Sequence, residues 1–230
     1  MAGSTASEVR DTVAEGAWRQ RLANAGAELG LLLTDADVDR LLAYLALRRR
    51  WNRVYNLTAL RDPAQMFSHH LVDCLAVLPA LRRHANRRDL RVLDVGSGGG
   101  LPGVVLAILQ PAWQVTCVDS VAKKVAFIQH VRAELSLANL HPAHSRVEAM
   151  PANAAFDLIT SRAFASLADF VKLTSGSLAV GGLWAAMKGR PSAEELAALP
   201  PYVDMFHVEQ LLVPGLDAQR CLIWIRPVRA

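Results

Sequence analysis

Apolar and polar positions along this chain follow two different periods, and the change falls at the polar, basic segment 82–89. Before it, apolar residues recur every three or four positions, which predicts successive amphipathic helices from residue 18 onwards. Thr34 followed by Asp37 is typical of a capping box at a helix start, and Asp62-Pro63 is typical of an N-cap with a first-turn proline.

After residue 89, short apolar runs alternate with helix-length segments. The expected strands are residues 91–95, 114–119, 139–143, 156–160 and a run after Gly181-Gly182, and the expected helices are residues 101–109, 121–137 and 167–173. This alternation predicts right-handed crossovers and a doubly wound α/β sheet. Residues 205–213 and 220–225 have no helix between them, so we expect an antiparallel hairpin at one edge.

Length and composition fit this arrangement. The 230 residues, 52% of them hydrophobic, are enough to bury a full core. Residues 1–16 carry no period and are expected to form a flexible tail. We expect a helical N-terminal extension over 17–85 and an α/β core over 86–230, with 17–230 forming one compact domain.

A glycine-rich stretch after the first expected strand carries the candidate binding chemistry. Five glycines lie between Gly96 and Gly103, where they permit positive φ and close approach of a ligand to the main chain. Gly98, Gly100 and Gly103 match the spacing of dinucleotide-binding loops, but this spacing alone is weakly specific.

Asp94 and Pro102 discriminate between ligands of this loop. A carboxylate there would repel a pyrophosphate, but it suits the ammonium and sulfonium groups of S-adenosyl-L-methionine. Pro102 lacks the backbone N–H that a phosphate would use. Both residues therefore favour a methyl donor over NAD.

Two further segments are candidates for cofactor contacts. Asp119 ends the second expected strand, where an acid accepts from ribose hydroxyls, although it would also cap the next helix. After the third strand, Val147 would pack on an adenine ring and Glu148 would accept from its amine. An ordinary surface loop is the alternative interpretation of these two residues.

The net charge of +4 is mild, so the distribution of charge is more informative than its sum. Six arginines and no acid lie from Arg40 to Arg61. With Trp51 and Tyr55, this segment suits phosphate contacts and base stacking in RNA, although solvated helix faces share the pattern, and Trp51 would also anchor the helices.

Several features exclude other classes of protein. The three cysteines form no close pair, which indicates reduced thiols, and His141-x-x-His144 lacks a third ligand, so no metal is expected. The chain shows no apolar leader and no apolar run near the ~20 residues of a membrane span, which predicts a cytoplasmic protein without membrane contact.

Ordered motif blocks extend through residues 42–188. They are Trp51-Asn52-x-x-Tyr55-Asn56-Leu57-Thr58, Arg61-Asp62-Pro63, His70-x-x-Asp73, Asp94-Val95-Gly96-Ser97-Gly98-x-Gly100-Leu101-Pro102-Gly103, Asp119-Ser120-x-x-Lys123-Lys124, Ser145-Arg146-Val147-Glu148, Ser161-Arg162-Ala163-Phe164 and Lys188-Gly189. Together these blocks closely resemble the small-subunit ribosomal RNA methyltransferase G family, also called glucose-inhibited division protein B.

The resemblance implies a Rossmann-like class I S-adenosylmethionine-dependent methyltransferase sheet, mostly parallel with an antiparallel C-terminal hairpin, preceded by N-terminal helices. It implies methyl transfer to N7 of a guanine in bacterial 16S ribosomal RNA, either free or in a precursor of the small ribosomal subunit. No feature indicates an oligomer, so a monomer is expected. The family's ligand positions fall on Gly96, Leu101, Val147, Glu148 and Arg162.

Two positions depart from the family pattern. Gly99 stands where relatives often carry proline, which should loosen the loop without abolishing binding. His69 stands where some relatives carry arginine, which weakens the case for RNA contact there.

Arg162 and Lys188 are the expected catalytic residues, because each ends a strand at the edge where ligands bind. The fork of Arg162 suits a guanine edge or a phosphate, and a structural ion pair is its alternative role. The full cofactor set is Asp94, Gly96, Gly98, Leu101, Asp119, Val147, Glu148 and Arg162, and the RNA set is Arg49, Arg50, Arg53, Asn56, Lys123 and Lys188. His70 and Asp73 suit a core pair or a shaping role at the site.

Two alternatives come from other functional classes. The first is an NAD-dependent oxidoreductase, against which Asp94 argues. The second is an RNA-binding module that retains the nucleotide-binding fold without catalysis.

Overall fold

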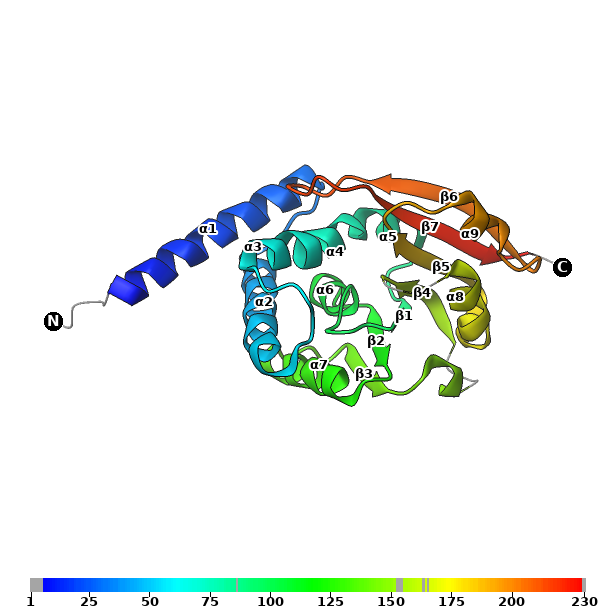
Figure 1. Cartoon of the computed structure of the whole chain (residues 1–230), viewed down its shortest axis with the longest axis horizontal. Helices are drawn as coiled ribbons and strands as arrows, with labels where there is room; N and C mark the ends of the chain where they lie inside the picture. Colours follow the sequence, from blue (N-terminus) through cyan, green and yellow to red (C-terminus); the bar gives the residue numbers. More distant parts are fainter. Residues whose placement is uncertain (1–5, 86, 152–154, 163, 165, 229–230) are drawn as a thin grey trace.

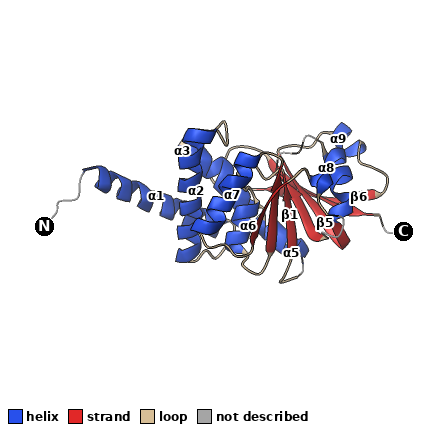
Figure 2. Ribbon diagram, turned by 90° about the horizontal axis from the view of Figure 1, so that it is seen from below, coloured by secondary structure: helices blue, strands red, loops and turns tan. Residues whose placement is uncertain are grey.

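The computed structural model describes residues 6–85, 87–151, 155–162, 164 and 166–228. Its centre is a seven-stranded sheet in the order β3-β2-β1-β4-β5-β7-β6 (Figures 1 and 2). The strands are β1 (Arg91–Val95), β2 (Gln114–Asp119), β3 (Leu140–His144), β4 (Phe156–Ser161), β5 (Leu178–Lys188), β6 (Val203–Leu211) and β7 (Arg220–Pro227). Strands β1 to β5 are parallel, and β7 is antiparallel to both β5 and β6. The predicted sheet and C-terminal hairpin are therefore confirmed.

Helices cover both faces of the sheet, as Figure 2 shows for α6 and α7 on one face and α8 on the other. The core helices are α6 (Gly103–Leu109), α7 (Ala122–Glu134), α8 (Leu167–Thr174) and α9 (Ala193–Ala197). Alternate residues of each strand enter different clusters, so Val92 packs with the α6 and α7 side and Leu93 with the α8 side. The short helix α9 was not predicted.

The N-terminal helices pack against the α6 and α7 side through one continuous hydrophobic cluster. They are α1 (Ala6–Glu28), α2 (Asp35–Tyr55), α3 (Pro63–Met66), a π-helical segment (Phe67–Val72), α4 (Asp73–Ala76) and α5 (Leu78–Ala85). The predicted caps are confirmed: Thr34 forms a capping box with Asp37, and Asp62 caps α3 ahead of Pro63. No helix of the described residues has both the length and the apolar character needed to cross a membrane.

Some expected boundaries differ from those of the structure. The first helix begins at Ala6, within the segment expected to be a tail, and projects from the body (Figure 1). Helix α5 extends to Ala85, into the polar, basic segment where the period changes. Strand β5 begins at Leu178, before Gly181 and Gly182. Gly182 lies beside a register shift between β4 and β5, where a Cβ atom would stand 2.9 Å from the Phe156 carbonyl oxygen. The glycine therefore marks an irregularity inside the strand and not its start.

Candidate functional site

The sheet has a topological switch point between β1 and β4. From β1 the chain steps outward to β2 and β3, and it then returns to add β4 and β5 on the other side of β1. The glycine loop leaves the carboxyl end of β1, and Arg162 follows the carboxyl end of β4. Open α/β sheets bind ligands at this position, so both predicted elements meet where a site is expected.

The glycine loop leaves its main chain open on the side of Gly96 and Gly98. Their φ values are +63° and +58°, which favours glycine, and a Cβ atom on either residue would meet no atom within 4 Å. A ligand can therefore approach the backbone closely here. Leu101, within this loop, is buried in the hydrophobic core.

Asp119 fastens the loop to the end of β2. One carboxylate oxygen accepts from the Gly98 N–H and the other from the Val121 N–H, each at 2.9 Å, and Lys124 lies 3.7 Å away. Asp119 thus organises both the loop and the start of α7. Each oxygen retains a further lone pair, so the expected ribose contact stays a prediction.

Asp94 is fully buried beneath the loop. Its Oδ2 accepts from the Gly103 N–H at 2.8 Å, and its Oδ1 has no hydrogen-bond partner among the described residues. Burial is the main reason that the pKa of Asp94 is raised to about 7. Gly103 must lack a side chain, because a Cβ atom there would stand 2.2 Å from Cys117 Sγ. The orphaned oxygen suits a cationic ligand beside the loop.

Helix α2 supports the loop from the opposite side through residues that the sequence did not single out. The Tyr44 hydroxyl donates to the Gly99 carbonyl at 2.6 Å. Arg48, which the sequence groups with the surface arginines, is only 2% exposed and donates from Nε to His70 Nδ1 at 3.2 Å. A Cβ atom on Gly99 would meet Arg48 Nη1, so a larger residue here would require the end of the Arg48 side chain to shift.

Removing the Tyr44 hydroxyl should loosen this support. We expect Tyr44→Phe to lower the free energy of unfolding by about 1–2 kcal/mol, because the Gly99 carbonyl loses a buried partner. Affinity for S-adenosyl-L-methionine should fall several-fold. Chemical denaturation and calorimetric titration measure the two effects, and Tyr202→Phe, which removes the hydroxyl of a tyrosine that is 48% exposed, is the matched control. Equal affinities for the two variants would show that the contact does not shape the loop.

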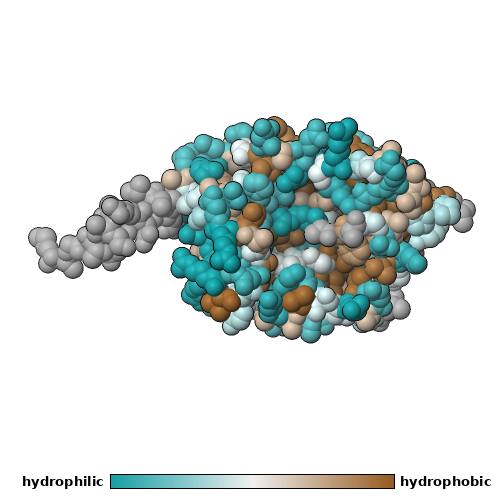
Figure 3. Space-filling model, in the orientation of Figure 1, coloured by the Kyte–Doolittle hydropathy of each residue, from teal (hydrophilic) through white to brown (hydrophobic). Residues whose placement is uncertain are grey.

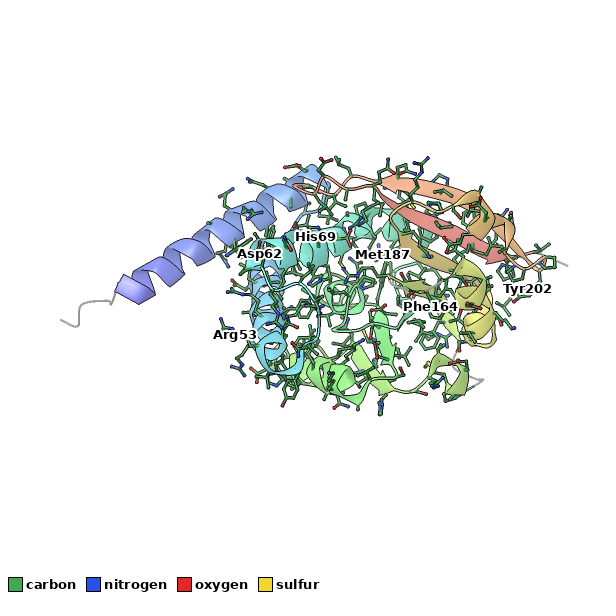
Figure 4. The ribbon with its side chains drawn as sticks, in the orientation of Figure 1. Arg53, Asp62, His69, Phe164, Met187 and Tyr202 are labelled. Carbon is green, nitrogen blue, oxygen red and sulfur yellow. The ribbon has the colours of Figure 1, made fainter. Side chains whose placement is uncertain are left out.

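A cavity of about 300 Å³ adjoins Arg162, and we call it the basic pocket. Its lining residues are Leu60, His69, His70, Asp73, Arg162, Met187, Lys188, Gly189, Leu211, Arg220 and Cys221. Figure 4 labels His69, from the helical extension, and Met187, from β5, which face this region from different elements. Arg220 was not predicted from the sequence.

Arg162 is positioned by the helical extension. Its Nη1 donates to the His69 carbonyl at 2.8 Å and lies 3.6 Å from Asp73 Oδ2. Arg162 lines the basic pocket and follows β4, the strand that pairs with β1 from which the glycine loop leaves. Its positive charge partly offsets the rise that burial causes in the pKa of Asp94. Arg162 can therefore form the structural ion pair with Asp73 and still face a ligand in the basic pocket.

His70 and Asp73 each contact an arginine. His70 accepts from Arg48, and its pKa is lowered to about 2, mainly by burial and then by the nearby Arg48 charge. Asp73 accepts from Arg220 Nε at 2.9 Å. Both residues thus tie the helical extension to the site.

Lys188 lies on the wall of the basic pocket, where it is held by two acceptors. Its Nζ contacts Glu195 Oε1 at 2.6 Å and the Phe164 carbonyl at 3.2 Å. Glu195 comes from helix α9, which was not predicted, and neither was this ion pair. Val147 is buried, and Glu148 is exposed, in the 3-10 turn after β3.

The predicted RNA residues lie mainly on the outer face of α2. Arg50 and Arg53 are exposed, and Arg49 and Arg53 line a small cavity of about 160 Å³ with Arg61. Hydrophilic residues gather over this part of the molecule in Figure 3, and Arg53 lies at its edge in Figure 4. Lys123 is exposed in the first turn of α7.

Two residues near this face are involved in packing. Trp51 packs against Phe127 and His130 of α7 with tilted rings, whose centroids are 5.4 and 5.6 Å away, so it anchors the helices, which was its alternative role. Asn56 adopts a left-handed conformation at the C-cap of α2, and its Oδ1 accepts from Arg61.

Histidines elsewhere do not join the site. His141 contacts Gln114, and His144 contacts the Ser120 carbonyl, both on the β3 side of the sheet. His84, His207 and Glu209 place potential ligand atoms within 4.8 Å of one another, with Arg83 paired to Glu209. The expectation that the chain holds no metal stays a prediction.

Comparison with known proteins gives consistent results. A family model described as "rRNA small subunit methyltransferase G" matches residues 37–223. Proteins named ribosomal RNA small subunit methyltransferase G from Acidovorax ebreus and Leptothrix cholodnii are 54% and 58% identical to this chain. The alignments cover 96% and 88% of this chain, and 99% and 93% of those proteins.

Solved structures with low sequence identity share the fold. A ribosomal protein L11 methylase from Lactobacillus delbrueckii subsp. bulgaricus has a TM-score of 0.52 and 16% identity, covering 69% of this chain and 78% of its own. A SAM-dependent methyltransferase from Aquifex aeolicus has a TM-score of 0.52 and 15% identity, and the match covers 75% of this chain and 97% of that one. These similarities give no support to the oxidoreductase alternative.

Proposed function

This chain belongs to the rRNA small subunit methyltransferase G family. From that premise we propose that it transfers a methyl group from S-adenosyl-L-methionine to N7 of a guanine in bacterial 16S ribosomal RNA. The observation that carries the proposal is one edge of the sheet, where the open glycine loop, with an orphaned carboxylate oxygen beneath it, leaves β1, and where Arg162, after the neighbouring strand β4, lines a pocket together with Lys188 and Arg220.

The residues around the loop fit the cofactor. Gly96 and Gly98 leave room for close approach, and Asp94 supplies a buried carboxylate for a cation. Asp119 would accept from ribose hydroxyls, Val147 would pack on the adenine, and Glu148 would accept from its amine. When bound, S-adenosyl-L-methionine supplies an electrophilic methyl group on a sulfonium.

The protein contributes alignment more than proton transfer. Guanine N7 has a free in-plane lone pair, so no general base is needed. Orientation of the reacting groups can contribute up to ~7–11 kcal/mol to lowering a barrier. Arg162 and Lys188 would orient the base or its phosphate through charge-assisted hydrogen bonds. Their ion pairs with Asp73 and Glu195 limit the positive charge facing a base that becomes cationic.

The outer face of α2 would hold the RNA. We expect the triple variant Arg49→Ala, Arg50→Ala, Arg53→Ala to bind 16S RNA roughly 10²-fold more weakly at moderate salt, with the logarithmic salt slope reduced by about 2. Filter binding across a salt series measures both quantities. A triple alanine variant of Arg82, Arg88 and Arg132, exposed arginines outside α2, is the control. An unchanged salt slope in the α2 variant would exclude this face.

Mapping the modified nucleotide tests the function directly. Mass spectrometry of 16S RNA, with and without this protein in the cell, should show one N7-methylguanine that depends on the protein. Purified protein with labelled methyl donor should restore it on RNA or on small subunits from the deficient strain. If the protein binds the donor but leaves both forms of the RNA unmodified, the proposal is wrong.

We also propose the cellular setting. The substrate is 16S RNA, free or in a precursor of the small subunit, and the protein acts in the cytoplasm as a monomer. Residues 17–230 form one folding domain, because the helical extension and the sheet share one hydrophobic cluster.

A further inference from the structure

The ion pair between Arg162 and Asp73 offers a hydrogen-bond donor and an acceptor side by side in the basic pocket. Arg162 Nη1 and Asp73 Oδ2 are 3.6 Å apart. Asp73 is only 4% exposed, yet it lines the pocket. Its Oδ1 accepts from Arg220, whereas its Oδ2 accepts no hydrogen bond from any residue in the described part of the chain. A buried carboxylate oxygen with free lone pairs favours an N–H donor from a ligand.

The order of these groups matches one base. On its Watson–Crick edge, guanine presents the O6 acceptor next to the N1–H donor, followed by the N2 amine. Adenine presents the reverse order, with an amine donor next to an N1 acceptor. A fixed pair of arginine donor and carboxylate acceptor is therefore complementary to guanine and opposed to adenine.

The pocket also suits a single base by its size and its walls. Its volume of about 300 Å³ lies at the lower end of the ~300–1,000 Å³ typical of small-molecule sites. Leu60, Met187 and Leu211 give it apolar surfaces on which a ring can pack. A cavity this small admits one base and not a base pair, so the base must leave the stack.

The direction of the pocket fits methylation at N7. Guanine O6 lies between N1 and N7, and Arg162, on the wall of the pocket, follows β4, the strand next to β1 from which the glycine loop leaves. If Arg162 donates to O6 while Asp73 accepts from N1–H, then N7 faces the loop. Arg220 fixes the Asp73 carboxylate from β7, so its orientation is set before a base enters.

Building on the proposed function, we propose that the basic pocket takes the target guanine extruded from the RNA. In it Arg162 donates to O6, and Asp73 accepts from N1–H and from the N2 amine. Asp73 is then a specificity-determining residue of the enzyme.

Base analogues test this assignment on the wild-type protein. The mapped target guanine is replaced by inosine, which keeps O6 and N1–H, or by 2-aminopurine, which lacks both but keeps N7. The kcat/KM for methylation of reconstituted small subunits should fall less than about tenfold with inosine and at least about 10²-fold with 2-aminopurine. Equal rates with the two analogues would overturn the assignment.

A variant separates recognition from structural support. In Asp73→Asn the amide oxygen should turn to Arg220, which leaves the NH₂ group facing N1–H. We expect the guanine to 2-aminopurine ratio of kcat/KM to fall at least about tenfold, while the Kd for S-adenosyl-L-methionine changes little. Asp157→Asn is the matched control. Asp157 also pairs with two arginines, Arg87 and Arg91, but it lies near the start of β4, at the other end of that strand from Arg162.

The outcomes are distinguishable. If Asp73→Asn slows both substrates equally, the residue only supports Arg162 and the inference is wrong. If wild-type protein methylates no guanine at N7, the proposed function itself has failed.

Discussion

Replacing Arg162 with alanine should reduce single-turnover methylation of small ribosomal subunits by about 10³-fold, because loss of one positioned donor at a reacting centre typically has an effect of 10²–10³-fold. Arg162 lines the basic pocket and follows β4, next to the strand from which the glycine loop leaves, so we expect its removal to disturb the alignment of the base with the methyl donor. RNA affinity should remain within a few-fold, because the exposed arginines of α2 are untouched. Rapid-mixing transfer of labelled methyl groups measures the rate, and filter binding measures the affinity.

Two controls distinguish function from structure. Arg162→Lys retains the charge but lacks the planar fork, and it should still lose about 10²-fold in rate. Arg132→Ala removes an exposed arginine from α7 and should be neutral. If Arg162→Ala loses RNA affinity in proportion to its rate, Arg162 acts in RNA binding and not in alignment. If its thermal stability collapses, the ion pair with Asp73 is mainly structural.

The sequence predicted the elements whose signals are local. Strands β1 and β2 match their expected bounds, and the caps at Thr34 and Asp62 depend on side chains only two or three residues away. The helix start at Ala6 was missed because residues 6–16 have no apolar stripe, and helix formation does not require one.

The candidate site was only partly predictable for the same reason. Gly96, Gly98 and Asp94 form a contiguous pattern, whereas Tyr44 lies 55 residues from Gly99 and Arg220 lies 147 residues from Asp73. Nothing in the sequence near Arg48 shows that it turns inward toward Gly99 while Arg50 and Arg53 remain exposed. Contacts between distant segments decide which members of an arginine run turn inward to support the loop and which remain exposed.

Asp94 gives the second large effect. At pH 8 we expect Asp94→Asn to bind S-adenosyl-L-methionine about 10²–10³-fold more weakly than wild type, because it loses a buried carboxylate facing a cation, an interaction of about 4 kcal/mol at 4 Å and an intermediate dielectric. The asparagine retains an acceptor for the Gly103 N–H, so the loop should keep its shape. Calorimetric titration measures the Kd, and a similar Kd for the two proteins would show that the carboxylate does not face the cofactor.

The dependence of this affinity on pH provides an independent check. In the free protein the pKa of Asp94 is about 7, so below pH 7 a cationic ligand must displace a proton before it binds the carboxylate. The wild-type Kd should therefore increase as the pH falls below 7, approaching tenfold per pH unit, whereas the Kd of Asp94→Asn should not show this increase.

The stability of the ligand-free protein should also depend on the protonation of Asp94, and it should fall as the pH rises. A carboxyl whose pKa is raised on folding favours the folded state fully below pH 4, and this contribution is lost as the pH rises through 7. The free energy of unfolding of the wild type should consequently fall from pH 4 to 7 relative to that of Asp94→Asn. Urea denaturation across that range measures it. Equal dependence of the unfolding free energy on pH in the two proteins would contradict the raised pKa of Asp94.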